Sequence, residues 1–388
     1  MNQTRTERVK LERKRRRRRR SSYLLPQIML LGAVLLTAGF LLQAQDAFTA
    51  IARLFQPDDS GQPAKHTAEP DSEDPAVNLT FVGDVIFSGH VERMLKENGY
   101  DYPYTHVSSL LGQDDYTVAN LETPVTKRGV PAQDKDFVYK SPPEAIPALK
   151  AAGVDLVNLA NNHSMDQGVE GLLDTFAVLQ ENEIEYVGAG ADIDRAYAPV
   201  YVERGGIKLA FLGFSRIVPE VSWYAGKNKP GVAATYDPAR AVQAIRGAKE
   251  QADLVIVIAH WGKERVDFPV DYQKELARAY IDAGADLIVG GHPHVLQGFE
   301  SYKNKWIAYS LGNFIFTRAT VPKTWETMVL QAKCTNAGAC ELKMLPYYAE
   351  LGRAVPMNEQ DGAALLQRIE SISTNVRIEP DGSVREKQ

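Results

Sequence analysis

Short apolar runs alternate with amphipathic segments along the chain, from residue 78 to about residue 311. Compact apolar runs predict buried β-strands, and apolar positions at helical spacing predict amphipathic helices. The predicted strands cover residues 78–83, 116–121, 155–160, 184–187, 253–259, 286–289 and 306–311. The predicted helices cover residues 91–98, 142–150, 168–182, 238–251 and 272–283. Such alternation predicts an α/β fold with parallel strands.

Two segments depart from this alternation and predict β-hairpins. One covers residues 201–213 and turns at two consecutive glycines. The other has strand-like runs at 327–333 and 341–348 on either side of Cys334 and Cys340, which predicts a disulfide that closes the hairpin. The spacing is wrong for a redox pair, so we interpret the disulfide as structural.

The connecting and terminal segments are less regular. Residues 215–236 are rich in Gly, Pro and Tyr and predict an irregular loop over one face. Asp237 is a plausible N-cap for the helix that follows, with Pro238 in its first position. The end of the chain, residues 351–388, predicts one helix at about 363–371 and then a polar tail that is loosely held.

The amino terminus predicts a membrane anchor. Residues 1–22 hold 11 Lys/Arg, and residues 24–42 are then free of charge. A helix of 19 residues is about 28 Å long, close to the thickness of a bilayer core. By the positive-inside rule, residues 1–22 form a basic cytoplasmic tail, 23–43 a single transmembrane helix and 44–76 a flexible linker. The alternative is a cleaved signal peptide.

This arrangement places the folded part, residues 77–350, outside the cell membrane. The two cysteines agree with that location, because disulfides persist in oxidising compartments. The basic tail carries a net charge of +9, which leaves −14 for the rest of a chain whose total is −5. So acidic a body is not expected to bind nucleic acid.

Several predicted strands end at side chains that bind metals. In an open α/β sheet the carboxyl ends of parallel strands share one edge, where ligands bind. Each residue alone has an ordinary interpretation as a helix cap, a surface charge or a turn former, but together they predict an open site for Mn, Zn or Fe. The residues are Asp84, Glu122, Asn162, His260, His292 and His294. His66, His90 and His106 are interpreted as solvated or surface residues, with His90 the least certain.

Six motifs in this order resemble the calcineurin-like metallophosphoesterases, and more closely the CapA/PgsA family of capsule and poly-γ-glutamate biosynthesis proteins. They are Phe81-Val-Gly-Asp-Val-Ile86, Ala119-Asn-Leu-Glu-Thr-Pro-Val125, Ala160-Asn-Asn-His-Ser-Met-Asp166, Ala259-His-Trp-Gly-Lys-Glu264, Gly290-Gly-His-Pro-His-Val295 and Tyr309-Ser-Leu-Gly-Asn-Phe314. The resemblance implies an α/β/β/α sandwich of two sheets flanked by helices, with one or two divalent metals at one rim.

The resemblance also implies roles for the site residues. Asp84 and His294 would bind a first metal, and Glu122 would bridge two metals. His163 would be a general acid near the leaving group. Asn162, His260 and His292 would bind the second metal.

Two departures from the superfamily pattern stand out. The first motif of the superfamily is Asp-x-His, but position 86 is Ile, so the first metal loses an imidazole unless His90 replaces it. Glu122 stands where the superfamily has a bridging aspartate. Such a site would hold one metal firmly and a second weakly, or only one.

The resemblance implies a membrane-anchored, extracellular component of capsule or poly-γ-glutamate synthesis or export. Its expected partners are the membrane, other membrane subunits of a synthase or export complex, and an anionic polymer such as poly-γ-glutamate. Two alternatives stay open: a metal-dependent phosphoesterase unrelated to capsule, and a non-catalytic scaffold that retains the site.

Overall fold

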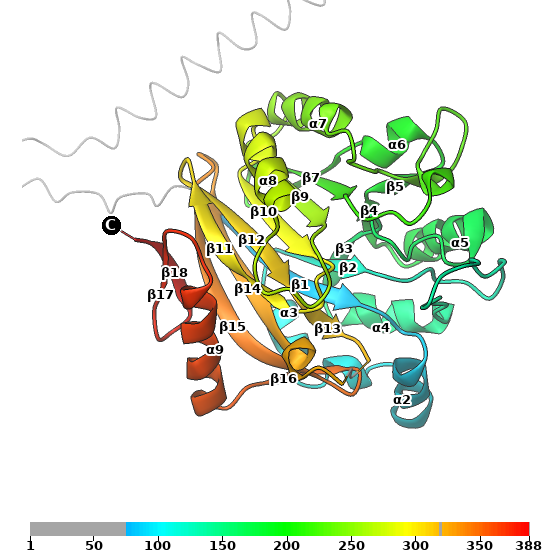
Figure 1. Ribbon diagram of the computed structural model, residues 1–388, viewed down its shortest axis with the longest axis horizontal. Helices are drawn as coiled ribbons and strands as arrows, with labels where there is room; N and C mark the ends of the chain where they lie inside the picture. The colour runs from blue at the N-terminus through cyan, green and yellow to red at the C-terminus, as the bar shows by residue number, and fades with distance from the viewer. Residues whose placement is uncertain (1–74, 318–319, 388) are drawn as a thin grey trace, which may run out of the picture. The chain divides into compact units, whose positions relative to one another are not determined.

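Two β-sheets form the centre of the computed structural model, which describes residues 75–317 and 320–387 (Figure 1). The larger sheet has ten strands, with β17-β18-β15-β14-β1-β2-β3-β4 in order, while β13 pairs with β1 and β16 with β15. Its strands are β1 (Ala76–Val85), β2 (Tyr116–Leu121), β3 (Val154–Asn158), β4 (Glu185–Val187), β13 (Asn313–Ile315), β14 (Glu326–Thr335), β15 (Cys340–Glu350), β16 (Arg353–Pro356), β17 (Val376–Ile378) and β18 (Ser383–Glu386).

The second sheet has six strands in the order β11-β12-β10-β9-β7-β6. They are β6 (Val200–Arg204), β7 (Ile207–Ser215), β9 (Leu254–His260), β10 (Leu287–Gly291), β11 (Leu296–Tyr302) and β12 (Lys305–Leu311). Strands β1 to β4 run parallel in the first sheet, and β7, β9, β10 and β12 run parallel in the second. A small third sheet joins β5 (Ala189–Gly190) to β8 (Gly231–Val232).

Helices cover the outer faces of both sheets, so the layers run helix, sheet, sheet, helix (Figure 1). Apolar residues of α4 and α5 join those of β1 to β3 in one buried cluster, and apolar residues of α7 and α8 join those of β7 and β9 in another. The α-helices are α2 (His90–Asn98), α3 (Ser108–Leu111), α4 (Ile146–Ala151), α5 (Gly168–Glu181), α6 (Ile193–Tyr197), α7 (Ala239–Lys249), α8 (Asp271–Ala283) and α9 (Glu359–Ser371).

A third buried cluster lies between the sheets. Phe81 of β1 and Leu330 of β14 contribute from the larger sheet, and Phe211 of β7 and Ile256 of β9 contribute from the smaller one. Alternate residues of one strand thus point to two different cores, as the two-residue period of a strand requires. The predicted α/β/β/α sandwich is therefore confirmed.

Most predicted elements are present, with shifts at their ends. The helix predicted at 142–150 is a 3-10 turn (Pro143–Ala145) followed by α4. Helix α7 begins at Ala239 with Pro238 as its N-cap residue, so the predicted N-cap Asp237 is one position early, although its Oδ1 accepts a hydrogen bond from the backbone N–H of Ala239 at 2.9 Å. The loop at 215–236 contains a 3-10 turn (Val221–Trp223) and β8.

The expectation of a loosely held tail is wrong. Strand β18 pairs with β15, and β17 pairs with β18, so the end of the chain extends the larger sheet. Leu365 and Ile369 of α9 are buried in the core between the sheets. Short polar strands of this kind lack the apolar alternation that reveals a strand in a sequence.

The predicted membrane anchor at residues 23–43 lies outside the described residues. Within residues 75–317 and 320–387, no helix is long and apolar enough to cross a bilayer.

The two sheets touch at the rim where their parallel strands end. A side chain at Gly83 of β1 would meet the carbonyl oxygen of Gly312 at 2.0 Å, and one at Gly291 of β10 would meet Oδ1 of Asp84 at 2.7 Å. Glycine is required at both positions because backbone or a buried carboxylate occupies the space of a Cβ. The ends of β1 and β10 therefore converge at one place.

The predicted disulfide is confirmed. Cys334 and Cys340 are directly opposite in the β14–β15 hairpin and are bonded to each other. Replacing both by Ser should lower the free energy of unfolding by about 2 kcal/mol, because the bond closes only a short loop. Chemical denaturation of the two proteins measures this difference, and a loss of more than about 4 kcal/mol would mean that the bond does more than close the hairpin.

Candidate metal centre

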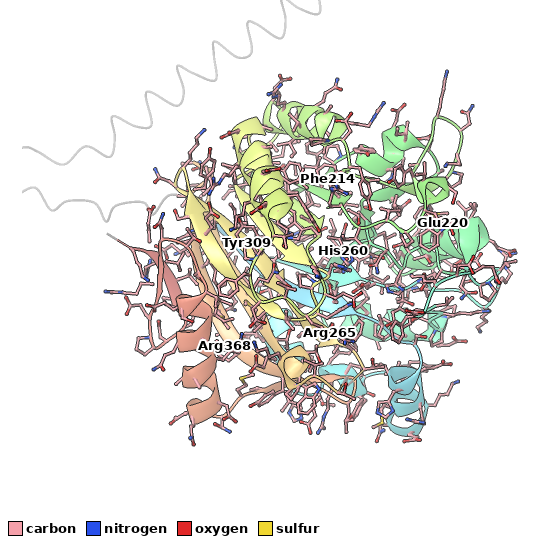
Figure 2. All side chains as sticks on the ribbon, viewed as in Figure 1. Phe214, Glu220, His260, Arg265, Tyr309 and Arg368 are labelled. Carbon is pink, nitrogen blue, oxygen red and sulfur yellow. A yellow bond between two sulfur atoms is a disulfide. The ribbon has the colours of Figure 1, made fainter. Side chains whose placement is uncertain are left out.

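The predicted ligands come together at the shared rim of the two sheets. Asp84 is the penultimate residue of β1, and Glu122 follows β2. His260, labelled in Figure 2, is the last residue of β9. His292 and His294 lie in the short loop that joins β10 to β11. Strand register places Asp84 beside Asn120, and Gly291 beside His260. Parallel pairing within each sheet, and contact between the sheets, thus bring residues more than 200 positions apart into one site.

The ligand atoms fall into two groups that share one residue. Asp84, Glu122 and His294 form the first group, and Glu122, His260 and His292 form the second; within each group the candidate ligand atoms lie within 4.8 Å of one another. Nε2 of His260 is 3.5 Å from Oε1 of Glu122, and Nε2 of His294 is 3.9 Å from the same oxygen. Glu122 therefore belongs to both groups, as a residue that would bridge two metals must.

Glu122 provides the test of whether these residues suit a metal. Both of its carboxylate oxygens are buried and have no hydrogen-bond partner, and Nδ1 of the buried His292 has none either. A buried carboxylate without donors is costly unless a cation neutralises it. Carboxylate and imidazole ligands arranged around such an atom suit divalent Zn, Mn or Fe. The donor set fits one or two metals.

Burial and neighbouring charges shift the pKa values of these groups. Burial, reinforced by the adjacent Asp84 carboxylate, raises the pKa of Glu122 well above its usual range. Burial, reinforced by neighbouring imidazoles, lowers the pKa of both His260 and His292. Burial also acts to lower the pKa of His294, but the carboxylates of Glu122 and Asp84 outweigh it and raise that pKa to about 9. The second group is therefore built from neutral imidazoles, the form that binds metal.

The backbone of the histidine loop adopts an uncommon conformation. His292 has a φ of 96° and His294 a φ of 55°, both in the left-handed region that non-glycine residues rarely adopt. The backbone N–H of His292 donates to Oδ2 of Asp84 at 3.3 Å, and the N–H of Arg265 donates to the carbonyl oxygen of Pro293 at 2.8 Å. These contacts hold a strained turn that directs both imidazoles inward, and such strain is concentrated at functional sites.

Asn162 and His163 lie beside the second group. Oδ1 of Asn162 is 2.7 Å from Nε2 of His260, which places this amide oxygen next to the predicted ligands. Nδ1 of the buried His163 is 2.6 Å from Oδ2 of Asp166, and the ring of Tyr139 packs against the imidazole with centroids 4.3 Å apart. The structure thus brings all seven predicted site residues to one place.

Several residues of the site are absent from the sequence-based prediction. Lys135 reaches in from the loop after β2, and its Nζ contacts the carbonyl oxygen of Asn162 at 2.6 Å, Nδ1 of His163 at 2.8 Å, and the carboxylate of Asp166. Asn313 holds Nδ1 of His294 at 2.9 Å. Asp166 and Asn313 lie within the quoted motifs, so the sequence contained a signal for both. Nothing in the sequence around Lys135 distinguishes it.

Comparison with known proteins agrees with this arrangement. Residues 78–318 match the family model of the bacterial capsule synthesis protein PGA_cap, and this span contains every residue of the site. The chain belongs to the PGA_cap family.

Curated relatives of this PGA_cap protein have related names. It is 36% identical over 302 residues to a capsule biosynthesis protein CapA of Bacillus anthracis, with 76% of this chain and 72% of the relative covered. It is also 36% identical over 275 residues to a PGA biosynthesis protein CapA of Bacillus subtilis, with 70% and 72% covered. A probable polyglutamine synthesis accessory protein of Mycobacterium tuberculosis is 35% identical over 211 residues, with 52% and 55% covered.

The solved structures that match are less similar in sequence. A hypothetical protein of Thermus thermophilus has a TM-score of 0.45 at 17% identity, covering 72% of this chain and all of that one. The NAD nucleotidase of Haemophilus influenzae has a TM-score of 0.41 at 13% identity, covering 77% of this chain and 57% of that one.

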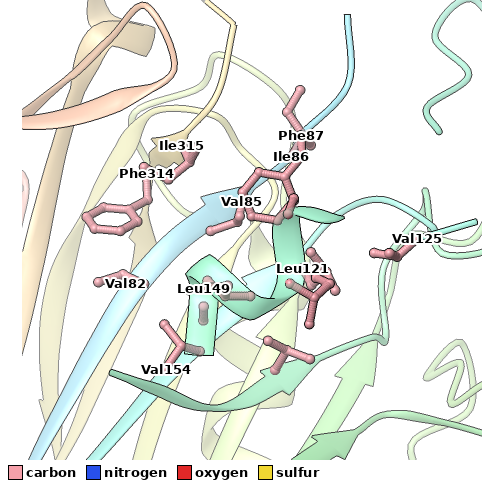
Figure 3. Packing of buried hydrophobic residues seen from close by; sticks show 14 of the residues in the cluster. Val82, Val85, Ile86, Phe87, Leu121, Val125, Leu149, Val154, Phe314 and Ile315 are labelled. Carbon is pink, nitrogen blue, oxygen red and sulfur yellow. The ribbon is translucent and has the colours of Figure 1, made fainter. Parts of the chain in front are cut away.

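Position 86, where the superfamily pattern has a histidine, belongs to the hydrophobic core. Ile86 is fully buried in the cluster that also contains Phe87, Leu121 and Phe314 (Figure 3). His90 does not replace that imidazole: it belongs to neither ligand group, and its Nδ1 contacts the guanidinium of Arg93 on α2. In this PGA_cap protein the first group thus relies on Asp84, Glu122 and His294.

We predict that replacing both His292 and His294 by Ala abolishes metal binding, because each group then loses an imidazole. Mass spectrometry of full-length protein purified in detergent should show about one to two divalent ions per chain before the change. His106 is exposed and belongs to neither ligand group, so it is the matched control. Its replacement by Ala should keep full metal content. Unchanged metal content in the double variant would refute the site.

Ile86→His tests whether the superfamily pattern can be restored. Because position 86 lies in an apolar cluster, the substitution should bury a polar ring without a partner and destabilise the fold by about 1–3 kcal/mol. Metal content should not rise above that of the unchanged protein. A variant that is stable and binds more metal would show that position 86 has access to the centre.

Proposed function

We propose that this protein is a membrane-anchored, extracellular, metal-dependent hydrolase that acts in the synthesis or export of capsule or poly-γ-glutamate. The observation that carries the proposal is the buried Glu122 carboxylate, which has no hydrogen-bond partner and belongs to both ligand groups. Membership of the PGA_cap family and the names of the CapA relatives support the pathway. The apolar segment at residues 23–43 and the basic residues before it support the anchor.

The ligand groups determine which chemistry is available. Asp84, Glu122, His260, His292 and His294 would hold the metal, which supplies Lewis acidity and lowers the pKa of a bound water towards about 7. The two groups share Glu122, so they are close enough for one substrate oxygen to approach both. This arrangement suits hydrolysis at a phosphoryl or acyl centre.

His163 would move a proton at the same centre. Its Nδ1 contacts Asp166 and Lys135, which leaves Nε2 as the nitrogen free to meet a substrate. Tyr139 covers one face of the ring, and the backbone N–H of His163 donates to Oδ1 of Asn161 at 3.1 Å. A ring fixed in this way can protonate a leaving group, which is worth roughly 10²–10⁴ in rate.

The expected partners follow from the same proposal. The substrate is an anionic polymer or one of its activated precursors, and the other subunits of the synthase or export complex lie in the membrane. Because the body of the chain is acidic, the metals and the local cation Lys135 would have to offset the repulsion between protein and polymer.

His163→Ala separates catalysis from a scaffolding role. The variant should retain its metal, since His163 belongs to neither ligand group, but polymer production in cells should fall to that of a strain lacking the protein. Metal analysis of the purified full-length chain tests whether the metal is retained, and measurement of cell-bound polymer tests whether production is lost. His106→Ala is the control for both. Normal polymer output from a metal-loaded His163→Ala protein would reject catalysis and favour the scaffold.

A further inference from the structure

A second cavity lies at the opposite end of strand β1 from the metal centre. Its volume is about 380 Å³, which is enough for a small ligand or a short segment of a polymer. Asn78 of β1 lines it, and Asp84 of the metal centre lies about 20 Å further along the same strand. None of the seven predicted site residues lines this cavity, so it is separate from the metal centre.

The floor of the cavity is the outer face of the larger sheet. Leu342 of β15 points into the core between the sheets, so Glu341 and Lys343 on either side of it point outward. Strand register places Glu341 beside Lys333 of β14, and Lys343 beside Ser383 of β18. The two-residue period of these strands therefore gives the sheet an apolar inner face and a polar, charged outer face.

Three cations line the cavity, one from each of three adjacent strands. They are Lys333 of β14, Lys343 of β15 and Arg385 of β18. Lys343 approaches only Asp381, at 3.8 Å, and among the described residues the side chains of Lys333 and Arg385 form no ion pair. All three cations are thus available to an anionic ligand.

Two acids also line the cavity, and they reduce its charge without cancelling it. Oδ2 of Asp114 accepts a hydrogen bond from Oγ1 of Thr117 at 2.7 Å, and Glu341 is exposed on the floor. The lining cations exceed the acids by one, on a chain whose net charge is −5. The cavity is therefore a locally cationic surface on an acidic protein, and such a surface attracts anions.

The remaining polar groups distinguish between kinds of anion. The side-chain amides of Gln113 and Gln331 line the cavity beside the cations. An amide both donates and accepts hydrogen bonds, so it can pair with a peptide group. A phosphate polymer only accepts, and it would leave the oxygens of both amides unused. The lining therefore suits a polymer that carries carboxylates on an amide backbone.

We propose that this cavity binds a segment of a γ-linked glutamate polymer. Its carboxylates would contact Lys333, Lys343 and Arg385, and its amide bonds would contact Gln113 and Gln331. The identity of the polymer rests on the proposed function. A segment held here leaves the rest of the chain to reach the rim about 20 Å away, and it raises the effective concentration of polymer at the metal centre.

Binding of a fluorescently labelled γ-linked glutamate oligomer to the full-length protein in detergent tests the proposal. Changing Lys333, Lys343 and Arg385 together to Gln should weaken binding roughly tenfold or more, because three charge contacts are lost. The matched control removes two lysines and one arginine from exposed positions outside the cavity and should leave the affinity unchanged. The control positions are Lys227, Arg246 and Lys303, each changed to Gln.

Glu341→Gln tests the same surface with the opposite sign. The substitution removes a negative charge from the floor of the cavity, so the oligomer should bind more tightly and the increase should fade as salt is added. A loss of structure would not strengthen binding, so this result does not depend on the stability of the triple variant. Weaker or unchanged binding by the Glu341→Gln protein would contradict the proposal.

The metal centre must not account for the binding. His292→Ala, His294→Ala protein should therefore bind the oligomer as tightly as the unchanged protein does. The cavity is rejected if this double variant loses binding, or if the triple Gln variant is folded by thermal unfolding and keeps full affinity. Normal polymer output from His163→Ala would reject the catalytic role of the metal centre and leave the cavity untouched.

Two further probes test the choice of ligand. A polyphosphate of equal charge should bind more weakly than the γ-linked oligomer, because it cannot use the amide oxygens of Gln113 and Gln331. An equally tight polyphosphate complex would overturn the assignment to a carboxylate polymer. An α-linked glutamate oligomer that binds more tightly than the γ-linked one would overturn it in favour of an acidic protein partner.

Discussion

The structure depends on burying the Glu122 carboxylate where no hydrogen-bond donor reaches it. An unsatisfied buried polar group costs about 1–3 kcal/mol, and a charged one costs more. Either a proton or a cation shared with the surrounding histidines would neutralise this group, and the raised pKa of Glu122 reflects the cost of leaving it charged. The fold is thus arranged around a carboxylate whose charge must be balanced.

The sandwich supplies this arrangement by joining two sheets that both contribute ligands. Asp84 and Glu122 lie at the ends of strands of the larger sheet, whereas His260, His292 and His294 lie at or just after the ends of strands of the smaller one. Neither sheet could form either ligand group without the other. Metal binding thus requires correct packing of the core between the sheets. The glycines at the rim allow the two sheets to touch there.

The alternation of apolar and amphipathic segments predicted the parallel strands, and the resemblance to the metallophosphoesterases implied the two-sheet sandwich. The candidate ligands could be selected because each lies at the end of a predicted strand, and the structure brings them together. A buried strand that ends in a metal-binding residue can be recognised within ten residues, and parallel strands must share a rim. Lys135 could not be predicted, since it comes from a loop without periodicity and reaches the site only through tertiary contacts. The terminal strand β18 has too little apolar alternation to be recognised.

The pairing of strand β1 lets it resist a pull along its axis. It runs for ten residues from Ala76 to Val85, past the rim at Asp84. Its first seven residues pair with β14 on one side, and residues from Leu79 onward pair with β2 on the other. A pull applied to the chain at Ala76 acts along the axis of this central strand, so both hydrogen-bond ladders must shear together before it yields. An edge strand would instead peel away one bond at a time. A force at Ala76 would therefore be shared by the central strands of the sheet before it could displace the strand that carries Asp84.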